Sequence, residues 1–157
     1  FACHSDQALR LLEQPTAYEQ QVLGAIKYQE NEVLLHTDAS ILPKRKTAWA
    51  AWNYHLLEND QGQVPVTYNM NILQGLDSDQ TFCVTLNNSN AIDQTKVLKR
   101  LQYHHPIYTQ ESVAAQARQS EINTDRLYFC GAYWRYGFHE DGVVSALNAI
   151  EKFKRDL

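Results

Sequence analysis

The sequence contains few of the residues that mark disulfide-stabilised or redox-active proteins. Only three of its 157 residues are cysteines, Cys3, Cys83 and Cys130, and none belongs to a Cys-x-x-Cys pair. An odd number of widely spaced cysteines with apolar neighbours argues against a disulfide framework and indicates buried, reduced thiols. We therefore expect the protein to work in a reducing compartment, the cytoplasm.

An excess of positive charge and long apolar runs are also missing. The chain has 14 lysines and arginines against 18 aspartates and glutamates, which gives a formal net charge of -4. Such a balance lacks the electrostatic footprint of a nucleic-acid-binding protein. No apolar stretch approaches the roughly 18 residues that cross a bilayer. We expect no nucleic-acid partner and no transmembrane segment.

Signatures of metal sites and of nucleophilic catalysis are absent as well. The six histidines, including the pair His104-His105, lack the i,i+4 or compact spacing with carboxylates that a zinc site needs. No Ser–His–Asp or Cys–His arrangement can be argued from spacing. Asp38, in the stretch HTDAS, is either a catalytic acid or the cap of a turn, and capping is the simpler interpretation. The sequence predicts no metal site and assigns no catalytic residue.

Glycine is scarce, yet three of the six glycines lie close together, Gly131, Gly137 and Gly142, in the stretch FCGAYWRYGFHEDG. The apolar run before Gly131 predicts a strand, and the amphipathic run after Gly142 predicts a helix. A glycine at a strand end lets the backbone approach a ligand closely. The first turn of a helix has free amide groups and a partial positive charge, so it can bind phosphate or the electron-rich edge of a flavin. Such strand–Gly–loop–Gly–helix patterns are common, so this one is suggestive without being specific.

Hydrophobic periodicity predicts helices at both ends of the chain and strands in the middle. Period-two alternation is clearest in residues 66–73 and 80–87, which are expected to pair as a hairpin. The last helix carries an apolar stripe of Val143, Leu147 and Ile150. The other expected helices cover 6–13 with Ser5 as N-cap and 16–24 with a Thr16–Glu19 capping box; one more follows a Thr109 cap, and another begins at about Asp141. The other expected strands lie on both sides of a turn at 29–31 and over 48–58, 96–108 and 126–131. A further turn is expected at 59–62.

This mixture predicts an α+β fold, with a central antiparallel sheet of four or five strands flanked by strand–helix units. Three segments are expected. Residues 1–25 hold the end of a strand and two helices, residues 26–108 form a sheet-containing lobe, and residues 109–157 supply a helix, a strand, a glycine loop and a final helix.

The stretch FCGAYWRYGFHEDGVVSALNAIE resembles the C-terminal flavin-binding segment of the flavin-containing amine oxidase superfamily. Together with YQENEVLLHTDASILPKRKTAWAAWNYHL, VTYNMNILQGL and YHHPIYT, it resembles the predicted NAD/FAD-binding, amine-oxidase-like proteins of bacteria and similar domains of plant cyclopropane fatty acid synthases. The resemblance covers nearly the whole chain. It implies an FAD-dependent oxidoreductase, with residues 26–108 as the substrate-binding lobe and the two flanking segments as parts of an FAD-binding lobe.

The resemblance also implies a set of site residues. Tyr133 stands where the family often has an acidic residue near the ribityl hydroxyls, and a tyrosine hydroxyl can donate a hydrogen bond there. Aromatic side chains at sheet spacing more often belong to a core, but some are expected to line a substrate cavity. The expected cofactor-binding residues are Gly131, Ala132, Tyr133, Gly137, Asp141, Gly142 and Val143, and the expected substrate-binding residues are Trp52, Tyr54, Tyr68, Asn69, Tyr103 and His104.

The ADP-binding half of such a site is missing from the sequence. The family binds the ADP part through G-x-G-x-x-G after a first strand, and the chain contains no such motif. Phe1-Ala2-Cys3 predicts the tail of a strand, so we expect the chain to be the C-terminal portion of a longer protein. FAD is then expected to bind only together with the N-terminal half, and this piece alone is expected to be inactive.

Two functions remain open. The first is the C-terminal part of an FAD-dependent, amine-oxidase-like oxidoreductase that passes hydride from an undefined, apolar or lipid-like substrate to the flavin. The alternative is a non-enzymatic α+β module that binds a ligand or a protein. A cut chain would expose apolar surface, and we therefore expect self-association as a homodimer.

Overall fold

The computed structural model describes residues 1–57, 62–124 and 126–157. The chain divides into two compact units: unit 1 consists of residues 1–29 and 105–157, and unit 2 of residues 30–104. The chain passes from one unit to the other twice, within strand β1 (Tyr28–His36) and within strand β5 (Val97–Pro106). Unit 2 is therefore an insertion between two segments that fold together.

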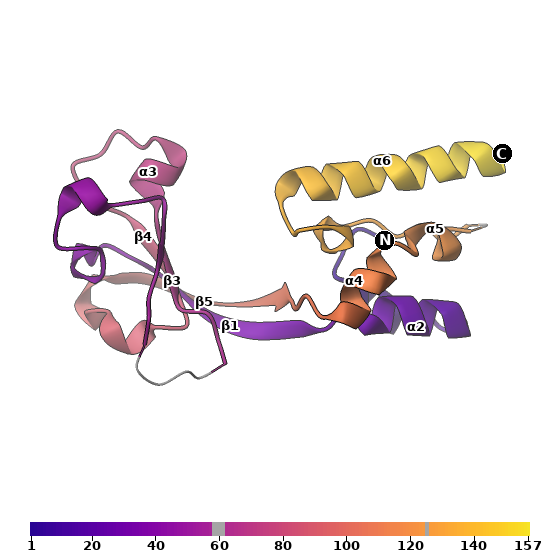
Figure 1. Ribbon diagram of the computed structural model, residues 1–157, viewed down its shortest axis with the longest axis horizontal. Coiled ribbons are helices and arrows are strands. Elements are labelled where there is room, and N and C mark those ends of the chain that lie inside the picture. Colours follow the sequence, from indigo (N-terminus) through magenta and orange to yellow (C-terminus); the bar gives the residue numbers. More distant parts are fainter. Residues whose placement is uncertain (58–61, 125) are drawn as a thin grey trace. The chain divides into compact units, whose positions relative to one another are not determined.

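Unit 2 is built around a five-stranded antiparallel sheet, so the predicted α+β fold with a central antiparallel sheet is confirmed (Figure 1). The other strands are β2 (Trp52–Tyr54), β3 (Val66–Asn69) and β4 (Cys83–Leu86), and the order across the sheet is β2-β3-β4-β1-β5. The expected antiparallel pairing of residues 66–73 with 80–87 is confirmed, with Thr67 opposite Thr85. The edge strand β2 has only three residues and offers little for further pairing, whereas the edge strand β5 has ten residues and ends at Pro106.

The connection between β3 and β4 differs from the expected hairpin. The strand alternation was expected to continue through Leu73, but helix α3 (Met70–Gln74) begins immediately after Asn69. The Asn69 side chain accepts a hydrogen bond from the Ile72 amide at 3.3 Å and thus caps the helix, and Gly75 ends it with a left-handed φ of 63°. Capping at both ends outweighs the alternation of the side chains.

Two other strand predictions are wrong. The turn expected at residues 29–31 does not exist, because β1 is continuous from Tyr28 to His36. The strand expected over 48–58 is reduced to β2, which follows a 3-10 turn at Lys46–Ala48. The turn expected at 59–62 lies almost wholly outside the described residues. The remaining 3-10 turns of unit 2 are Ala39–Ile41, Ser89–Ala91 and Gln94–Lys96.

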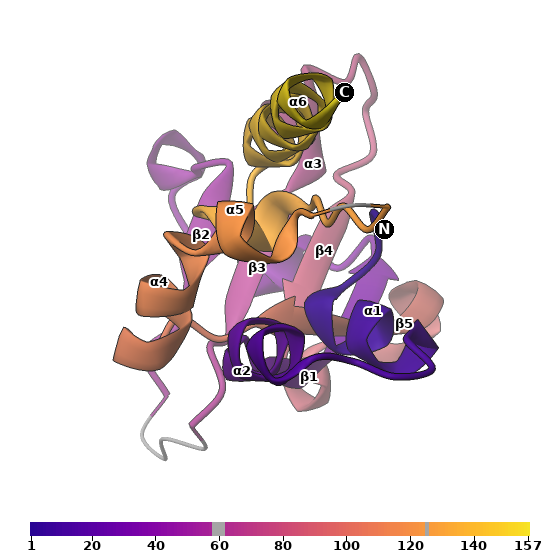
Figure 2. The same ribbon diagram turned by 90° about the vertical axis from the view of Figure 1, so that its right-hand side faces the viewer.

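Unit 1 is helical. Its elements are α1 (Ser5–Leu11), α2 (Ala17–Ala25), α4 (Gln110–Gln116), α5 (Gln119–Ile122), a 3-10 turn at Ala132–Trp134 and α6 (His139–Asp156). Figures 1 and 2 show α6 on one side of the segment that leads from α5 to the glycine loop, and α1 and α2 on its other side. The core joins apolar side chains of these elements, among them Leu23, Ile122, Phe129 and Trp134.

Local capping signals were predicted well in this unit. The Thr16 hydroxyl accepts a hydrogen bond from the Glu19 amide at 3.2 Å, and the Glu19 carboxylate accepts one from the Thr16 amide. The predicted capping box is therefore confirmed. Thr109 caps α4 as expected. The predicted Ser5 cap is wrong: His4 is the N-cap of α1, and Ser5 is a buried first helical residue whose hydroxyl bonds to the Ile26 carbonyl.

The strand expected over 126–131 is not formed; this segment is extended but is not part of a sheet. Its backbone pairs instead with the first residue: the Phe1 amino group donates to the Tyr128 carbonyl at 2.7 Å, and the Cys130 amide donates to the Phe1 carbonyl at 2.9 Å. Bonds to the residues on either side of Phe129 are the pattern of a parallel pairing. The rings of Phe1 and Phe129 stack at 5.3 Å.

Helix α6 begins two residues before the expected start at Asp141 and exposes its apolar stripe. Val143, Leu147 and Ile150 are 55%, 59% and 49% exposed, while Ser145 and Ala149 face the core. The expected homodimer stays a prediction.

Within the described part of the chain, none of the helices combines the length and the apolarity that a membrane crossing requires.

Candidate functional site

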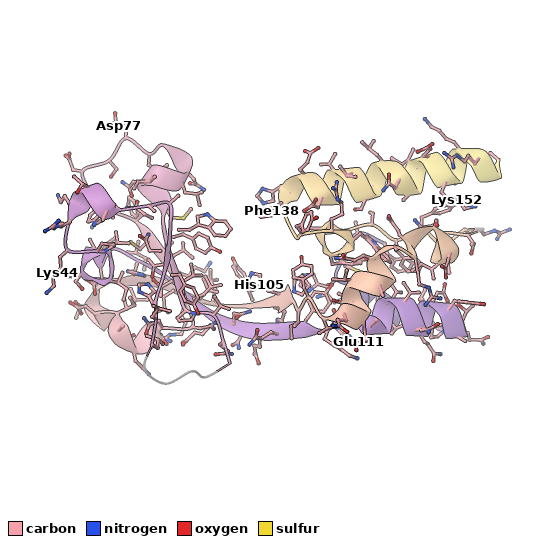
Figure 3. All side chains as sticks on the ribbon, in the orientation of Figure 1. Lys44, Asp77, His105, Glu111, Phe138 and Lys152 are labelled. Carbon is pink, nitrogen blue, oxygen red and sulfur yellow. The ribbon has the colours of Figure 1, made fainter. Side chains whose placement is uncertain are left out.

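The glycine loop runs from Gly131 to Gly142 and joins the extended segment to α6. Phe138 stands at the start of α6, and Lys152 lies toward its other end (Figure 3). The Gly131 amide donates to the Ser145 hydroxyl at 2.8 Å, and the same hydroxyl donates to the Gly142 carbonyl. Ser145 therefore ties the first glycine of the loop to the first turns of α6.

Three amide side chains hold the backbone on the other side of this loop. Gln116 donates to the carbonyls of Tyr133 and Arg135, at 2.9 and 2.6 Å. Gln119 donates to the Phe129 carbonyl at 2.9 Å, and Asn123 accepts from the Phe129 amide at 2.7 Å.

Sequence reasoning missed these amide residues. The available signal was their spacing, Gln116, Gln119 and Asn123, which recurs every three or four residues as on one helical face. A polar face at that spacing is usually exposed, but Gln119 and Asn123 are buried. Their partners are backbone groups of a distant segment, which the pattern itself does not indicate.

Gly131 is needed by a side chain of the chain itself. A Cβ atom at this position would lie 2.4 Å from the Tyr133 ring, far inside contact distance. Tyr133 is 4% exposed, and among the described residues its hydroxyl has no hydrogen-bond partner. Burial raises the pKa of Tyr133 well above its ordinary value. The close approach expected for a ligand at Gly131 is thus taken by Tyr133.

Gly137 shows the same relation. Its φ is 90°, in the region that favours glycine, and a Cβ atom there would lie 2.7 Å from the Tyr108 hydroxyl. Gly142 differs, because a Cβ atom there would make only an ordinary contact at 3.8 Å with the Ala132 amide nitrogen. Of the three loop glycines, two are therefore required by tyrosines of unit 1.

Asp141 occupies part of the helix start. It is 5% exposed, and its carboxylate accepts the Phe138 amide at 3.0 Å and the Tyr136 amide at 3.2 Å. The Arg135 guanidinium lies 3.7 Å from the same carboxylate. Asp141 is consequently a structural cap that already offsets part of the positive end of α6.

We expect the Asp141→Ala substitution to lower the free energy of unfolding by about 1 kcal/mol, as loss of a helix cap does. Urea denaturation followed by circular dichroism measures this change. The matched control is Glu140→Ala, on the same helical turn but exposed, and it should leave stability nearly unchanged. Equal effects of the two substitutions would contradict the capping role.

Among the described residues, the amides of His139 and Glu140 at the first turn of α6 have no hydrogen-bond acceptor. Both residues are exposed, and their amide groups belong to the set that a helix leaves without internal partners. They can donate hydrogen bonds to an electron-rich edge or to one anionic oxygen. Val143, which was expected beside the cofactor, is exposed on the apolar stripe one turn further on.

The residues expected to bind substrate do not form one group. Trp52, Tyr54 and Tyr68 share one face of the sheet; Trp52 lies opposite Tyr68 with the ring centroids 5.2 Å apart. Trp52 and Tyr54 are 54% and 61% exposed. Asn69 is buried as the cap of α3 and faces the other way. Tyr103 and His104 belong to β5, at the opposite edge of the sheet.

The expected capping role of Asp38 is confirmed. Its carboxylate is 2% exposed and accepts hydrogen bonds from the Ser40 amide, the Asp93 amide and Lys96 at 3.2, 2.9 and 3.3 Å. Burial alone would raise the pKa of Asp38, but these donors together hold it well below its ordinary value. A carboxylate so fully satisfied does not act as a catalytic acid.

Other candidate sites are few. In the described ranges, no three His, Cys, Asp or Glu side chains come together as metal ligands. An open cavity of about 580 Å³ lies between α2 and α4, with Ala25, Ala114 and Ala115 in its wall. It includes none of the residues expected to bind flavin or substrate.

Neither a protein-family model nor a curated protein matches the chain. The likeness to the amine oxidase superfamily therefore rests on the sequence stretches quoted above.

Proposed function

We propose that this chain is the C-terminal part of an FAD-dependent, amine-oxidase-like oxidoreductase. The observation that carries the proposal is the arrangement of the chain: residues 1–29 and 105–157 fold together around the glycine loop, while residues 30–104 form a separate sheet-containing unit. This arrangement suits a substrate lobe inserted into a cofactor-binding lobe. The parallel pairing of Phe1 with residues 128–130 adds support, because parallel strands are typical of α/β lobes.

The residues present fit one edge of a flavin ring and not a whole FAD molecule. The open amides of His139 and Glu140 would hold an electron-rich edge, whereas no G-x-G-x-x-G turn is available for the pyrophosphate. Two expected contacts, at Gly131 and Gly137, are filled by tyrosines. FAD supplies hydride acceptance; this chain would orient the ring and contribute sheet residues to the substrate site.

We expect the full-length protein to show the absorbance bands of a bound oxidised flavin, and this chain alone to bind FAD weakly. The sharpest variant is His139→Pro, since proline is well tolerated at the first helical position and removes only the amide hydrogen. It should weaken FAD binding by the full-length protein about tenfold, the worth of one hydrogen bond.

His139→Ala, which keeps the amide, is the matched control and should bind FAD like the parent protein. Flavin bands with unchanged affinity in His139→Pro would place the flavin away from α6. A full-length protein without flavin bands would overturn the oxidoreductase proposal altogether.

The alternative is a non-enzymatic binding module, and one observation favours it. Trp52, Tyr54 and Tyr68 lie together on one sheet face with two of them largely exposed, an arrangement common at binding surfaces. The flavin spectrum separates the two functions.

A further inference from the structure

A chain of four side chains crosses the interior of unit 2 from strand to strand. Nε2 of His36 lies 2.7 Å from the Thr85 hydroxyl, which lies 2.7 Å from the Thr67 hydroxyl, which in turn lies 2.8 Å from Nε2 of His55. His36, Thr67 and Thr85 are at most 1% exposed. This hydrogen-bonded chain links His55, the residue after β2, to β3, β4 and β1. It has no part in the flavin proposal or in the helix caps described above.

The inner end of the chain has a fixed direction. The Asp38 amide donates to Nδ1 of His36 at 3.1 Å. A backbone amide can only donate, so Nδ1 must carry the lone pair and a neutral His36 must carry its hydrogen on Nε2. His36 therefore donates to Thr85.

This direction passes to the outer end. Thr85 has one hydroxyl hydrogen, and Thr67 is the only acceptor within hydrogen-bond distance of it in the described structure. Thr67 then donates to Nε2 of His55, which must carry its hydrogen on Nδ1. If His55 donated instead, Thr67 would donate to Thr85, and the buried Thr85 hydrogen would have no acceptor, which is unfavourable.

We propose that this hydrogen-bonded chain is a pH-dependent lock on the β2 edge of the sheet, which closes only when His36 and His55 are both neutral. A protonated His55 has donors on both ring nitrogens and cannot accept from Thr67. A protonated His36 would turn a second donor against the Asp38 amide. Since β2 has only three residues, loss of the link at His55 weakens the end of an edge strand that is otherwise held by three residue pairs with β3 and by the Asn53 bond to the Thr67 carbonyl.

The groups that face His36 do not remove this requirement. The charged group that acts on the pKa of His36 is the Asp38 carboxylate, which is itself held by Lys96 and the Asp93 amide. Cys83 lies opposite His36 on β4, and burial raises the pKa of this thiol to about 11, so it stays neutral. Burial lowers the pKa of His36 even though Asp38 opposes the change.

The pH window follows from the two histidines. Burial also lowers the pKa of His55, and among the described residues no charged group adds to this shift. Both folded-state pKa values thus lie below the ordinary value of about 6.5. Below about pH 6.5 the unfolded or released state binds more protons, so the lock weakens as the pH falls and is complete above that value.

Nitrogen-15 NMR of the histidine rings in the whole chain tests the lock directly. We expect hydrogen on Nε2 in His36 and on Nδ1 in His55 at about pH 7.5. We also expect amide hydrogen exchange at His55, whose amide donates to Pro65, to lose protection about fivefold at about pH 5.5 after correction for intrinsic rates. The opposite tautomer at either histidine, or protection that does not change with pH, would overturn the proposal.

Thr67→Val supplies the matching variant, because it removes the donor to His55 and nearly keeps the shape. We expect it to raise the pKa of His55 by about 1, the worth of the lost buried hydrogen bond. Thr95→Val is the control, since Thr95 is an exposed residue of unit 2 that does not belong to the hydrogen-bonded chain. An unchanged His55 pKa in a folded Thr67→Val protein would contradict the lock.

Discussion

Replacing Asp38 by alanine is expected to lower the free energy of unfolding of unit 2 by about 3 kcal/mol. The carboxylate is 2% exposed and holds the 3-10 turn after β1 to the turn before β5 through the Ser40 and Asp93 amides. Lys96 adds a charge contact at 3.3 Å but is itself half-exposed, so little of the effect comes from it. Removing Asp38 leaves the Ser40 and Asp93 amides, whose hydrogen bonds are part-buried, without this acceptor.

Urea unfolding at neutral pH measures this loss, with Asp79→Ala as the control, because Asp79 is an exposed aspartate of the same unit. The effect should depend on pH in a defined direction. Since the folded pKa of Asp38 lies below its unfolded value of about 3.9, its contribution is complete above that pH and fades as the pH falls below it. A destabilisation that persists undiminished at about pH 2 would show that charge is not the cause.

Replacing Gly131 by alanine is expected to destabilise unit 1 by about 2 to 3 kcal/mol. The added methyl group would lie 2.4 Å from the Tyr133 ring, and this ring cannot move freely because Tyr133 belongs to the core. A site shaped for a ligand would respond differently: stability would be unchanged, and only cofactor binding would suffer.

Two further comparisons make this test specific. Gly24→Ala is the control, because a methyl group inside α2 would meet only Leu9 at 3.8 Å, and it should be neutral or slightly stabilising. In a Tyr133→Leu background, Gly131→Ala should cost clearly less than in the parent protein, since the clash is with the ring. Equal cost in both backgrounds would place the strain in the backbone instead.

The sequence by itself predicted those features that depend on neighbours along the chain. The caps at Thr16 and Thr109 involve a residue three positions away, and the cap at Asp38 begins two positions away at Ser40. The end of β5 at Pro106 and the alternation in residues 66–69 likewise depend on residues that are close together in the sequence. These local signals, added together, sufficed for the α+β class.

Where sequence prediction was wrong, distant partners or competing caps decided. Residues 29–31 look like a turn, but they continue strand β1, which pairs with β4 from Val33 onward. The apolar residues 126–131 look like a strand, but in the described structure they make only a single bridge at Leu127 and a short pairing with Phe1. Residues 70–73 alternate like a strand, but Asn69 and Gly75 cap the segment 70–74 as a helix.

For the candidate site, the sequence located the loop and the structure decided what fills it. Glycine spacing marked residues 131–142 as a place of close approach, which the structure bears out at Gly131 and Gly137. Which group makes the approach depends on contacts that spacing along the chain does not encode, and here Tyr133 and Tyr108 make it. The same holds for the interior of unit 2. The hydrogen-bonded chain from His36 to His55 forms only when three strands pair in the correct register, so the sequence alone does not indicate which residues belong to it.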